Sequence, residues 1–178
     1  MNKVVVIICA LLISACAQMT YDPSKPIKND EGLVVAKIYM SGSVGSAQII
    51  TRNKNRILDN YSFVMKQKET LFVFPMPVGT HTLDQILYGQ GSQLVDVDLD
   101  CLGEFKIEPN KVNYIGDIYF SADPMDNYIV FSAHNSSFKV QDNYEAIIKE
   151  VNNKYDSIKT RFESVNTVVG PSTCKQEG

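Results

Sequence analysis

The stretch Val112-Asn113-Tyr114-Ile115-Gly116-Asp117-Ile118-Tyr119-Phe120 carries the clearest structural pattern in the chain. Its β-branched and aromatic residues recur at a period of two, which is typical of a β-strand. The alternation predicts one face made of Val112, Tyr114, Gly116, Ile118 and Phe120. The intervening residues, Asn113, Ile115, Asp117 and Tyr119, are then expected on the other face.

Shorter runs of the same kind lie on both sides of this strand. Strands are predicted at 33–40, 47–51, 57–66, 70–76, 80–88, 94–100, 103–108, 128–132 and 137–140. Glycine, proline and asparagine separate them every roughly ten residues, which is the spacing of a sandwich or barrel. The glycines between 33–40 and 47–51 predict that these two strands form a hairpin. The expected fold class is mainly β, a β-sandwich of about eight strands.

After Asp142 the period becomes that of a helix. Apolar residues recur at helical spacing: Tyr144, Ile147, Ile148, Val151, Tyr155, Ile158 and Phe162. Asp142 with Glu145 three residues on is a capping-box pattern, so one C-terminal α-helix is predicted from Asn143 to about Arg161. We expect its apolar stripe to pack on the sheet, with partner binding as the alternative. Residues 163–178 show little period and are predicted to form a polar tail of the domain 32–178.

The beginning of the chain is of a different kind. Lys3 is followed by an apolar run at 4–13, then by two small residues and Cys16. A short basic region before a short apolar run is typical of a secretory signal. The run is about a dozen residues long, whereas a membrane-spanning helix needs roughly 20. A retained membrane span and a secretory signal cut without lipid attachment are the alternatives.

The end of this run, Ile13-Ser14-Ala15-Cys16, resembles the lipobox of bacterial lipoproteins. The resemblance implies that 1–15 is a signal peptide and that the lipid on Cys16 holds the protein in a membrane. Ala17 stands where an aspartate in Gram-negative lipoproteins favours the inner membrane, so the resemblance implies the outer membrane, facing the periplasm. Residues 16–31 have two prolines and no period, and are predicted to be a flexible tether.

Composition narrows the classes of partner. Removal of Lys3 with the signal leaves 17 − 1 = 16 basic residues against 20 acidic ones, a net charge of −4. A mildly acidic chain without a basic cluster binds nucleic acid poorly, so no nucleic-acid partner is expected. No second long apolar segment follows the first, so nothing else is expected to span a membrane.

Two of the four cysteines are candidates for a disulfide. Cys9 would leave with the signal, and Cys16 would carry the lipid. Cys101 and Cys174 remain in a compartment that permits disulfides, so a bridge between them is predicted. The loop of 174 − 101 = 73 residues would be stabilised by roughly 4 kcal/mol in the chain-entropy model. Two unpaired thiols are the alternative.

Three aspartates at alternate positions are the one cluster that suggests a metal. Asp96, Asp98 and Asp100 begin like a calcium loop, but Cys101 and Ile107 stand where that loop needs glycine and glutamate. A solvated strand face is therefore expected for these aspartates. No metal site and no cofactor are predicted.

Three further residues are weighed as catalytic candidates. His81 and His134 are the only histidines, and neither lies in a zinc-binding or serine-hydrolase pattern. Asp117 lies mid-strand beside Gly116 and would be either a buried carboxylate or a solvated one. No residue is predicted to be catalytic. The rival hypothesis is an enzyme or glycan-binding domain that uses a cleft near His81 or Asp117.

Segments 77–83 and 105–117 resemble small β-sandwich lipoproteins of bacterial envelopes. In the first segment a proline-glycine turn leads into a strand. In the second a hairpin turns at Pro109-Asn110 into Tyr114-Ile115-Gly116-Asp117. The resemblance implies a transthyretin-like sandwich without a known activity and supplies no catalytic residues. The expected function is a non-catalytic binding or structural module of the envelope, with another envelope protein as partner.

Overall fold

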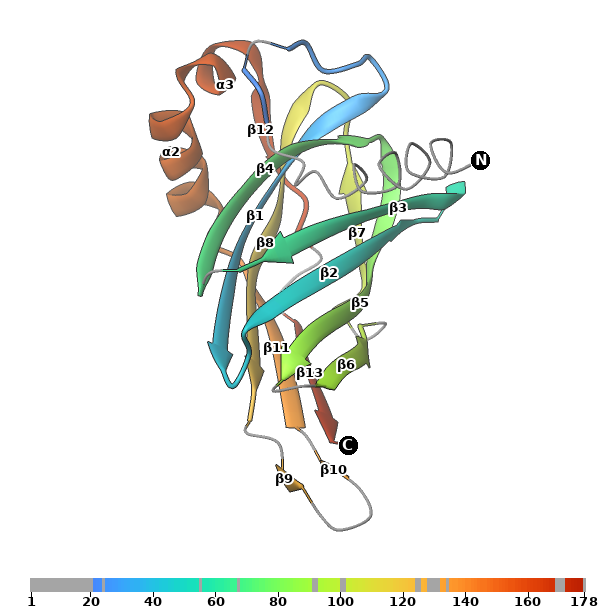
Figure 1. Ribbon diagram of the computed structural model, residues 1–178. Helices are drawn as coiled ribbons and strands as arrows, with labels where there is room; N and C mark the ends of the chain where they lie inside the picture. Colours follow the sequence, from blue (N-terminus) through green and yellow to red (C-terminus); the bar gives the residue numbers. More distant parts are fainter. Residues whose placement is uncertain are drawn as a thin grey trace, which may run out of the picture.

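Two β-sheets pack face to face in the computed structural model of the chain, and two helices lie against the outer side of one sheet (Figure 1). The structure describes residues 21–23, 25–54, 56–66, 68–90, 93–99, 102–123, 126–127, 132–133, 135–168 and 172–177. The predicted mainly β fold is confirmed as a β-sandwich. The strand predicted at 128–132 falls, except for Ser132, outside the described residues.

The larger sheet has six strands and carries the helices. Its strands are β1 (Glu31–Gly42), β4 (Glu69–Pro77), β8 (Lys111–Ala122), β11 (Asn135–Gln141), β12 (Glu163–Asn166) and β13 (Ser172–Glu177). The order across the sheet is β13-β11-β8-β1-β4, with β12 also beside β8. The helices are α2 (Tyr144–Lys154) and α3 (Asp156–Arg161).

The smaller sheet has five strands and lies on the other side of the core. Its strands are β2 (Ser46–Asn53), β3 (Arg56–Met65), β5 (Gly79–Gln90), β6 (Gln93–Asp98) and β7 (Glu104–Ile107). The order is β3-β2-β5-β6, with β7 also beside β5. A separate short pair is made by β9 (Asp126–Asn127) and β10 (Ser132–Ala133).

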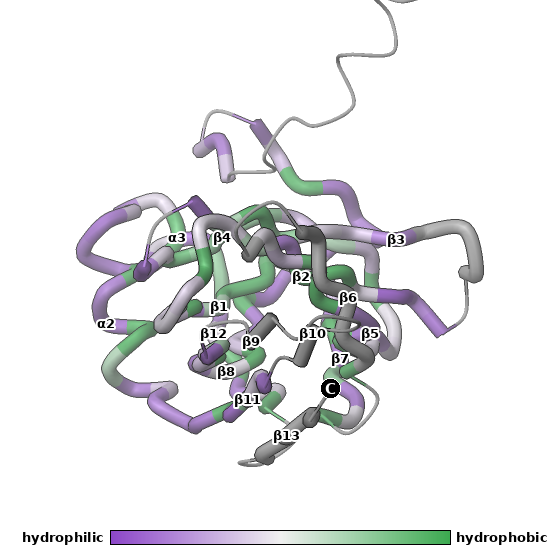
Figure 2. Tube along the Cα trace, turned by 60° about the horizontal axis from the view of Figure 1, so that its bottom comes forward, coloured by the Kyte–Doolittle hydropathy of each residue, from purple (hydrophilic) through white to green (hydrophobic). Residues whose placement is uncertain are grey.

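Apolar side chains from both sheets fill the space between them. Phe63 of β3 packs edge-on against Phe72 and Phe74 of β4, with ring centroids 5.3 and 4.9 Å apart. The largest fully buried side chains of this core are Tyr88, Phe63, Phe74, Phe120, Phe138, Ile38, Ile49, Met65, Met76 and Ile86. In Figure 2 the hydrophobic stretches gather on the central strands and the hydrophilic ones at the periphery. The strands predicted at 57–66 and 70–76 are confirmed as β3 and β4.

The chain crosses repeatedly from one sheet to the other. β1 pairs with β4 and β8, whereas β2 pairs with β3 and β5, so the hairpin predicted for 33–40 with 47–51 is wrong. The hairpin expected at Pro109-Asn110 is wrong for the same reason, because β7 pairs with β5 and lies in the other sheet from β8. Turn residues show where a chain reverses, but long-range burial decides which strand the next one joins.

A β-bulge in β8 changes the predicted alternation. Val35 of β1 lies opposite Tyr114, but the next residue, Ala36, lies opposite Gly116, so Ile115 is an extra residue. Gly116 has φ +122°, a backbone angle that only glycine adopts readily. An extra residue in one strand exchanges the two faces beyond it. Side chains of β8 therefore lie on the outer face of the sheet at Val112, Tyr114, Asp117 and Tyr119, and in the inner core at Ile115, Ile118 and Phe120.

The predicted single C-terminal helix is two helices, and strands follow them. The helix breaks at Tyr155, which has φ −135° and ψ 83°, outside the helical region. The break keeps Ile158 and Val151 on the same buried side, so the apolar period continues through it unchanged. The predicted polar tail instead contains β12, which pairs with β8, and β13, which pairs with β11. Strands at or near a sheet margin need no alternating apolar pattern, which is why these were missed.

A second, smaller apolar cluster lies between the helices and the outer face of the six-stranded sheet. Its buried members are Tyr21, Leu33, Val35, Val73, Val112, Tyr114, Ile147, Val151 and Ile158. The prediction that the helical stripe packs on the sheet is confirmed. Lys37 of β1 adds two ion pairs, each 2.8 Å long, to Glu150 of α2 and Glu69 of β4. The helical layer is thus held by both burial and charge.

The outer edge of β4 is covered by the segment that precedes β1. The Tyr21 backbone N–H donates to the Val73 carbonyl at 2.6 Å, and the Tyr21 side chain is buried beside Tyr155. The backbone N and carbonyl groups of a strand point alternately to one side and the other, so the backbone positions of Pro75 and Pro77 face the same open edge as Val73. Proline has no N–H, so neither position offers a donor at that edge. The part of the predicted tether from Tyr21 onward therefore contacts the domain. Among the described residues no helix is long and apolar enough to cross a membrane.

Candidate functional site

His81, the first catalytic candidate, lies inside the sandwich. Its side chain is fully buried, and its Nε2 lies 2.9 Å from the Pro77 carbonyl oxygen. A carbonyl oxygen only accepts, so Nε2 donates. The imidazole also stacks on Phe105, with ring centroids 5.6 Å apart. This histidine braces the start of β5 against the core, while His134 lies outside the described residues.

Asp117, the second candidate, is the centre of a buried polar network. Its side chain is 1% exposed. The Tyr114 hydroxyl donates to one carboxylate oxygen at 2.8 Å, and the Asn143 side-chain amide donates to the other at 2.8 Å. The Asn143 backbone N–H in turn donates to the Tyr114 hydroxyl at 3.0 Å. We call these three residues the Asp117 network.

The environment of the Asp117 network affects the tyrosine in particular. Burial raises the pKa of Tyr114, the hydrogen bond from the Asn143 N–H opposes the shift, and the Asp117 carboxylate reinforces it. A phenol with a raised pKa stays protonated and keeps its role as donor to Asp117. The network therefore ties β8 to the start of α2 as a permanent structural bond.

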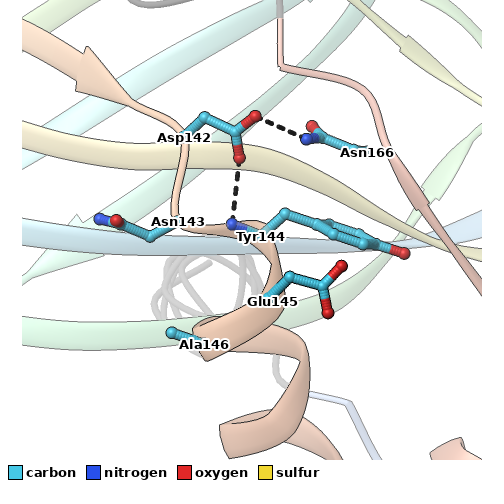
Figure 3. Close-up of a pocket in the computed structure, with 6 residues that line it drawn as sticks. All are labelled: Asp142, Asn143, Tyr144, Glu145, Ala146 and Asn166. Atoms are coloured by element: carbon cyan, nitrogen blue, oxygen red, sulfur yellow. Dashed lines mark hydrogen bonds between the residues drawn. The ribbon is translucent and has the colours of Figure 1, made fainter.

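A second group of bonds joins the same helix start to β12. The Asp142 carboxylate accepts from the Tyr144 N–H at 3.0 Å and from the Asn166 amide at 2.7 Å (Figure 3). The Tyr144 N–H is not the donor that the predicted capping box requires, which is the N–H of Glu145. Thr167 continues the connection, since its N–H and hydroxyl donate to the Tyr114 carbonyl at 2.9 and 3.0 Å.

An open pocket of about 440 Å³ lies at this helix start. Its lining residues, drawn in Figure 3, are Asp142, Asn143, Tyr144, Glu145, Ala146 and Asn166. The lining offers two carboxylates and two amides, which suit hydrogen bonds from a hydroxylated or amino ligand. Asp117 lies behind Asn143 and is too buried to reach a ligand there. The pocket lining contains no nucleophile paired with a base.

The prediction of no metal site at Asp96, Asp98 and Asp100 concerns residues that the structure describes only in part. Within the described residues no group of three or more His, Cys, Asp or Glu side chains could hold a metal ion. Asp96 and Asp98 lie in β6, but their side chains are outside the description, as is the whole of Asp100. The expected solvated face for these aspartates stays a prediction.

The cysteine predictions also stay open. Cys16 and Cys101 lie outside the described residues, and only the backbone of Cys174 is placed. That backbone lies in β13 opposite Phe138, so the segment is held by strand pairing rather than by a bridge alone. Intact mass of the unreduced protein, with and without alkylation, will show whether Cys101 and Cys174 are joined. Two alkylated thiols would contradict the disulfide.

The two catalytic candidates do not meet. His81 lies in the core between the sheets, whereas Asp117 lies on the outer side of the six-stranded sheet. A cleft that joins them is therefore ruled out by the intervening sheet. One sign of the Asp117 network is visible in the sequence, because a glycine inside a strand often marks a bulge and Gly116 does so here.

One accessible feature was missed from the sequence. On the outer face of the larger sheet, below the helices, Tyr39 and Tyr119 stack with ring centroids 4.5 Å apart and planes at 5°. They are register partners on β1 and β8. Glu69 follows on β4 beside Tyr39, and Lys139 on β11 beside Tyr119. We call these four residues the tyrosine row; its tyrosines are partly exposed and its charged ends are exposed.

No family model, curated protein or solved structure matches the chain.

Proposed function

We propose that the chain is a lipid-anchored protein of the outer membrane, acting as a non-catalytic binding or structural module of the cell envelope. The observation that carries the non-catalytic part is the position of His81 and Asp117. Each is buried, and each bonds to its own chain. The side chains most suited to catalysis are thus engaged in holding the sandwich together.

The anchor part of the proposal rests on Ile13-Ser14-Ala15-Cys16. If Cys16 carries the lipid, the spacer to the first docked residue, Tyr21, is 21 − 16 = 5 residues. Five extended residues reach about 17 Å. The domain would then be held close to the lipid surface, with the end that carries Tyr21 and Tyr155 on the membrane side. A domain so restrained presents its remaining surfaces sideways and away from the membrane.

Fatty-acid labelling tests the anchor directly. Cells expressing the full-length protein are fed a labelled fatty acid, and the label is followed in wild type, Cys16→Ser and Cys9→Ser. We expect Cys16→Ser to lose the label and to be released from the lipidated membrane fraction. Cys9→Ser is the matched control, because it also removes a cysteine from the same segment and should keep the label. Unlabelled wild-type protein would refute the anchor.

The choice of membrane is tested at the next residue. Ala17→Asp should shift the labelled protein from outer-membrane to inner-membrane fractions on a density gradient. Ala17→Ser, which changes size little and adds no charge, should leave it in the outer membrane. Equal distribution of wild type and Ala17→Asp would contradict the proposed location while leaving lipidation intact.

A second candidate function is favoured by the pocket at the start of α2. Its carboxylates and amides fit a hydroxylated ligand, so a glycan-binding or enzymatic role would act there rather than at His81. Glu145→Gln together with Asn166→Ala should abolish saccharide binding measured by calorimetry if this candidate is right. Absence of heat with envelope glycans for the wild type would leave the non-catalytic module as the better account.

A further inference from the structure

The tyrosine row lies on the part of the outer sheet face that the helices do not cover. Lys37, one step above it on β1, pairs with Glu150 and marks the level reached by α2. Below that level β1, β8 and β11 continue beyond the helix (Figure 1). Ser41, Ser121 and Ser137 form the next step down, with the Ser121 and Ser137 hydroxyls 2.7 Å apart. The described residues thus leave a face of tyrosines and serines on the outer side of the sheet.

The tyrosines of this face belong to the residue types that are enriched at protein contact surfaces. Tyrosine offers a large, rigid contact area at low conformational cost, and serine offers adaptable hydrogen bonds. Tyrosine is also enriched among the residues that dominate binding energy at interfaces. The mutual stacking of Tyr39 and Tyr119 fixes both rings before any partner arrives. A preordered aromatic pair loses little freedom on binding.

The charges identify the partner. Across the strands the row reads Glu69, Tyr39, Tyr119, Lys139, with an acid at one end and a base at the other. Glu69 also pairs with Lys37 of its own chain, but Lys37 pairs with Glu150 as well, so a net negative charge stays at this end of the row. We propose that this face binds a second copy of the same chain. A twofold axis parallel to the strands places each Glu69 over the Lys139 of the other copy and each Tyr39 over the other Tyr119. A self-complementary patch of this kind is what a symmetric dimer requires.

The charge order also selects the arrangement. A twofold axis along the row would place Glu69 over Glu69 and Lys139 over Lys139, which is repulsive. Only the axis parallel to the strands brings opposite charges together at both ends. Two sheets that pack face to face prefer strand directions within about 30° of each other, which this axis permits.

The face is small, so the dimer is expected to be weak in free solution. An interface of fewer than about ten residues a side falls below the standard size of stable complexes. Confinement to a membrane raises the effective concentration of a binding partner and compensates for modest affinity. This last step rests on the proposed lipid anchor; the contact itself does not.

Zero-length crosslinking tests the contact. Full-length protein in detergent is prepared unlabelled and isotope-labelled, mixed, and treated with a carbodiimide that joins a carboxylate to a touching amine. Within one chain Glu69 and Lys139 are three strand spacings apart, about 14 Å, too far for such a link. We expect mixed-isotope peptides that join Glu69 to Lys139. Links from these residues to 1–20 of the same chain would show that this segment covers the face and would overturn the proposal.

Charge reversal provides the second test, read by sedimentation equilibrium. Lys139→Glu should weaken the dimer about tenfold or more, because both end contacts become repulsive. Adding Glu69→Lys to that variant should restore it, because both contacts are attractive again. Lys37 loses Glu69 in this variant but keeps its ion pair with Glu150, and circular dichroism checks that the fold is unchanged. Lys149→Glu, on the exposed side of α2, is the matched control and should have no effect. Lys139 is exposed, so its variant is expected to fold.

The outcomes separate this proposal from the proposed function. Monomeric wild type up to high concentration, without mixed crosslinks, overturns the dimer even if fatty-acid labelling succeeds. A dimer that is broken by Lys139→Glu and rescued by the double variant supports it even if labelling fails. Loss of the dimer in the control variant would also count against the row as the contact.

Discussion

The inner face of the six-stranded sheet meets a second sheet, whereas its outer face meets two helices and then open surface. The inner core is a broad cluster of apolar and aromatic side chains, with His81 among the few polar residues inside it. The outer layer has a smaller apolar cluster, supplemented by the Asp117 network and the Lys37 ion pairs. Burial alone suffices where the buried area is large. Where it is small, specific polar bonds and one glycine complete the packing.

The first test compares the loss of stability caused by a substitution in the inner core with that caused by one in the outer layer. Phe63→Ala should lower the free energy of unfolding by about 3–5 kcal/mol, because it leaves a cavity between Phe72 and Phe74. Urea unfolding followed by circular dichroism measures the change. Phe162→Ala, in the partly buried helical layer, is the comparison and should cost less. Equal losses at the two positions would contradict the contrast.

The second test attacks the bulge on which the outer layer depends. Gly116→Ala should cost about 2–3 kcal/mol, because φ +122° is strained for any residue with a Cβ. The new Cβ would also lie 2.6 Å from Val140 Cγ1. Gly45→Ala, where no atom lies within 4 Å of a new Cβ, is the matched control and should have little effect. Similar melting temperatures for the two variants would show that the bulge is not strained.

The smallest expected change in stability comes from the ion pairs of Lys37, one of which joins β1 to α2. Hydrogen bonds to Glu150 and then Glu69 raise the pKa of Lys37 above its usual 10.5. A raised pKa means that this stabilisation is complete below pH 10.5 and is lost as the pH rises further. Lys37→Met should cost about 1 kcal/mol at neutral pH and should flatten the loss of stability above that pH. Salt should weaken wild type more than the variant.

Alkaline denaturation also reports on Tyr114, so the two contributions must be separated. Its raised pKa likewise predicts stability that is lost at high pH. Tyr114→Phe keeps the ring and removes the ionisable group. If Lys37→Met and Tyr114→Phe flatten the alkaline loss additively, the ion pairs and the Asp117 network stabilise the layer independently.

Strands in the inner core were predictable because both the period and the residue types point the same way. Phe72, Phe74 and Met76 recur at every second position and all lie in the inner core, while Val73 between them is buried on the other face, under the helices. In β8 the same reasoning failed after Gly116. One extra residue there exchanges the inner and outer faces of the strand, and the alternation of residue types does not reveal it. The hairpins failed because adjacent strands can join different sheets at a corner.

The outer layer was less predictable because its determinants are not periodic. The helix break at Tyr155 adds no residue to the apolar pattern, so nothing in the spacing reveals it. β12 and β13 are short and polar, and their partners lie far away in the sequence. The sequence leaves open whether Asp117 is buried or solvated. The answer depends on the helix start, which brings Asn143 against its carboxylate. Tyr39 and Tyr119 meet because β1 and β8 are neighbours, which sequence alone does not show.

The central position of β1 has a consequence for how the chain folds. The two strands that pair with β1 follow it in the sequence and are synthesised after it. Val35 pairs with Val73 and Tyr114, which are 73 − 35 = 38 and 114 − 35 = 79 residues further along. Such non-local pairing makes folding slow, on the order of milliseconds to seconds. Until β8 arrives, the apolar strand 33–38 has only one side to pair with or none, and it can associate with other unfolded chains. The sandwich therefore closes only after most of the polypeptide has emerged from the ribosome. Until then the chain stays unfolded and vulnerable to aggregation.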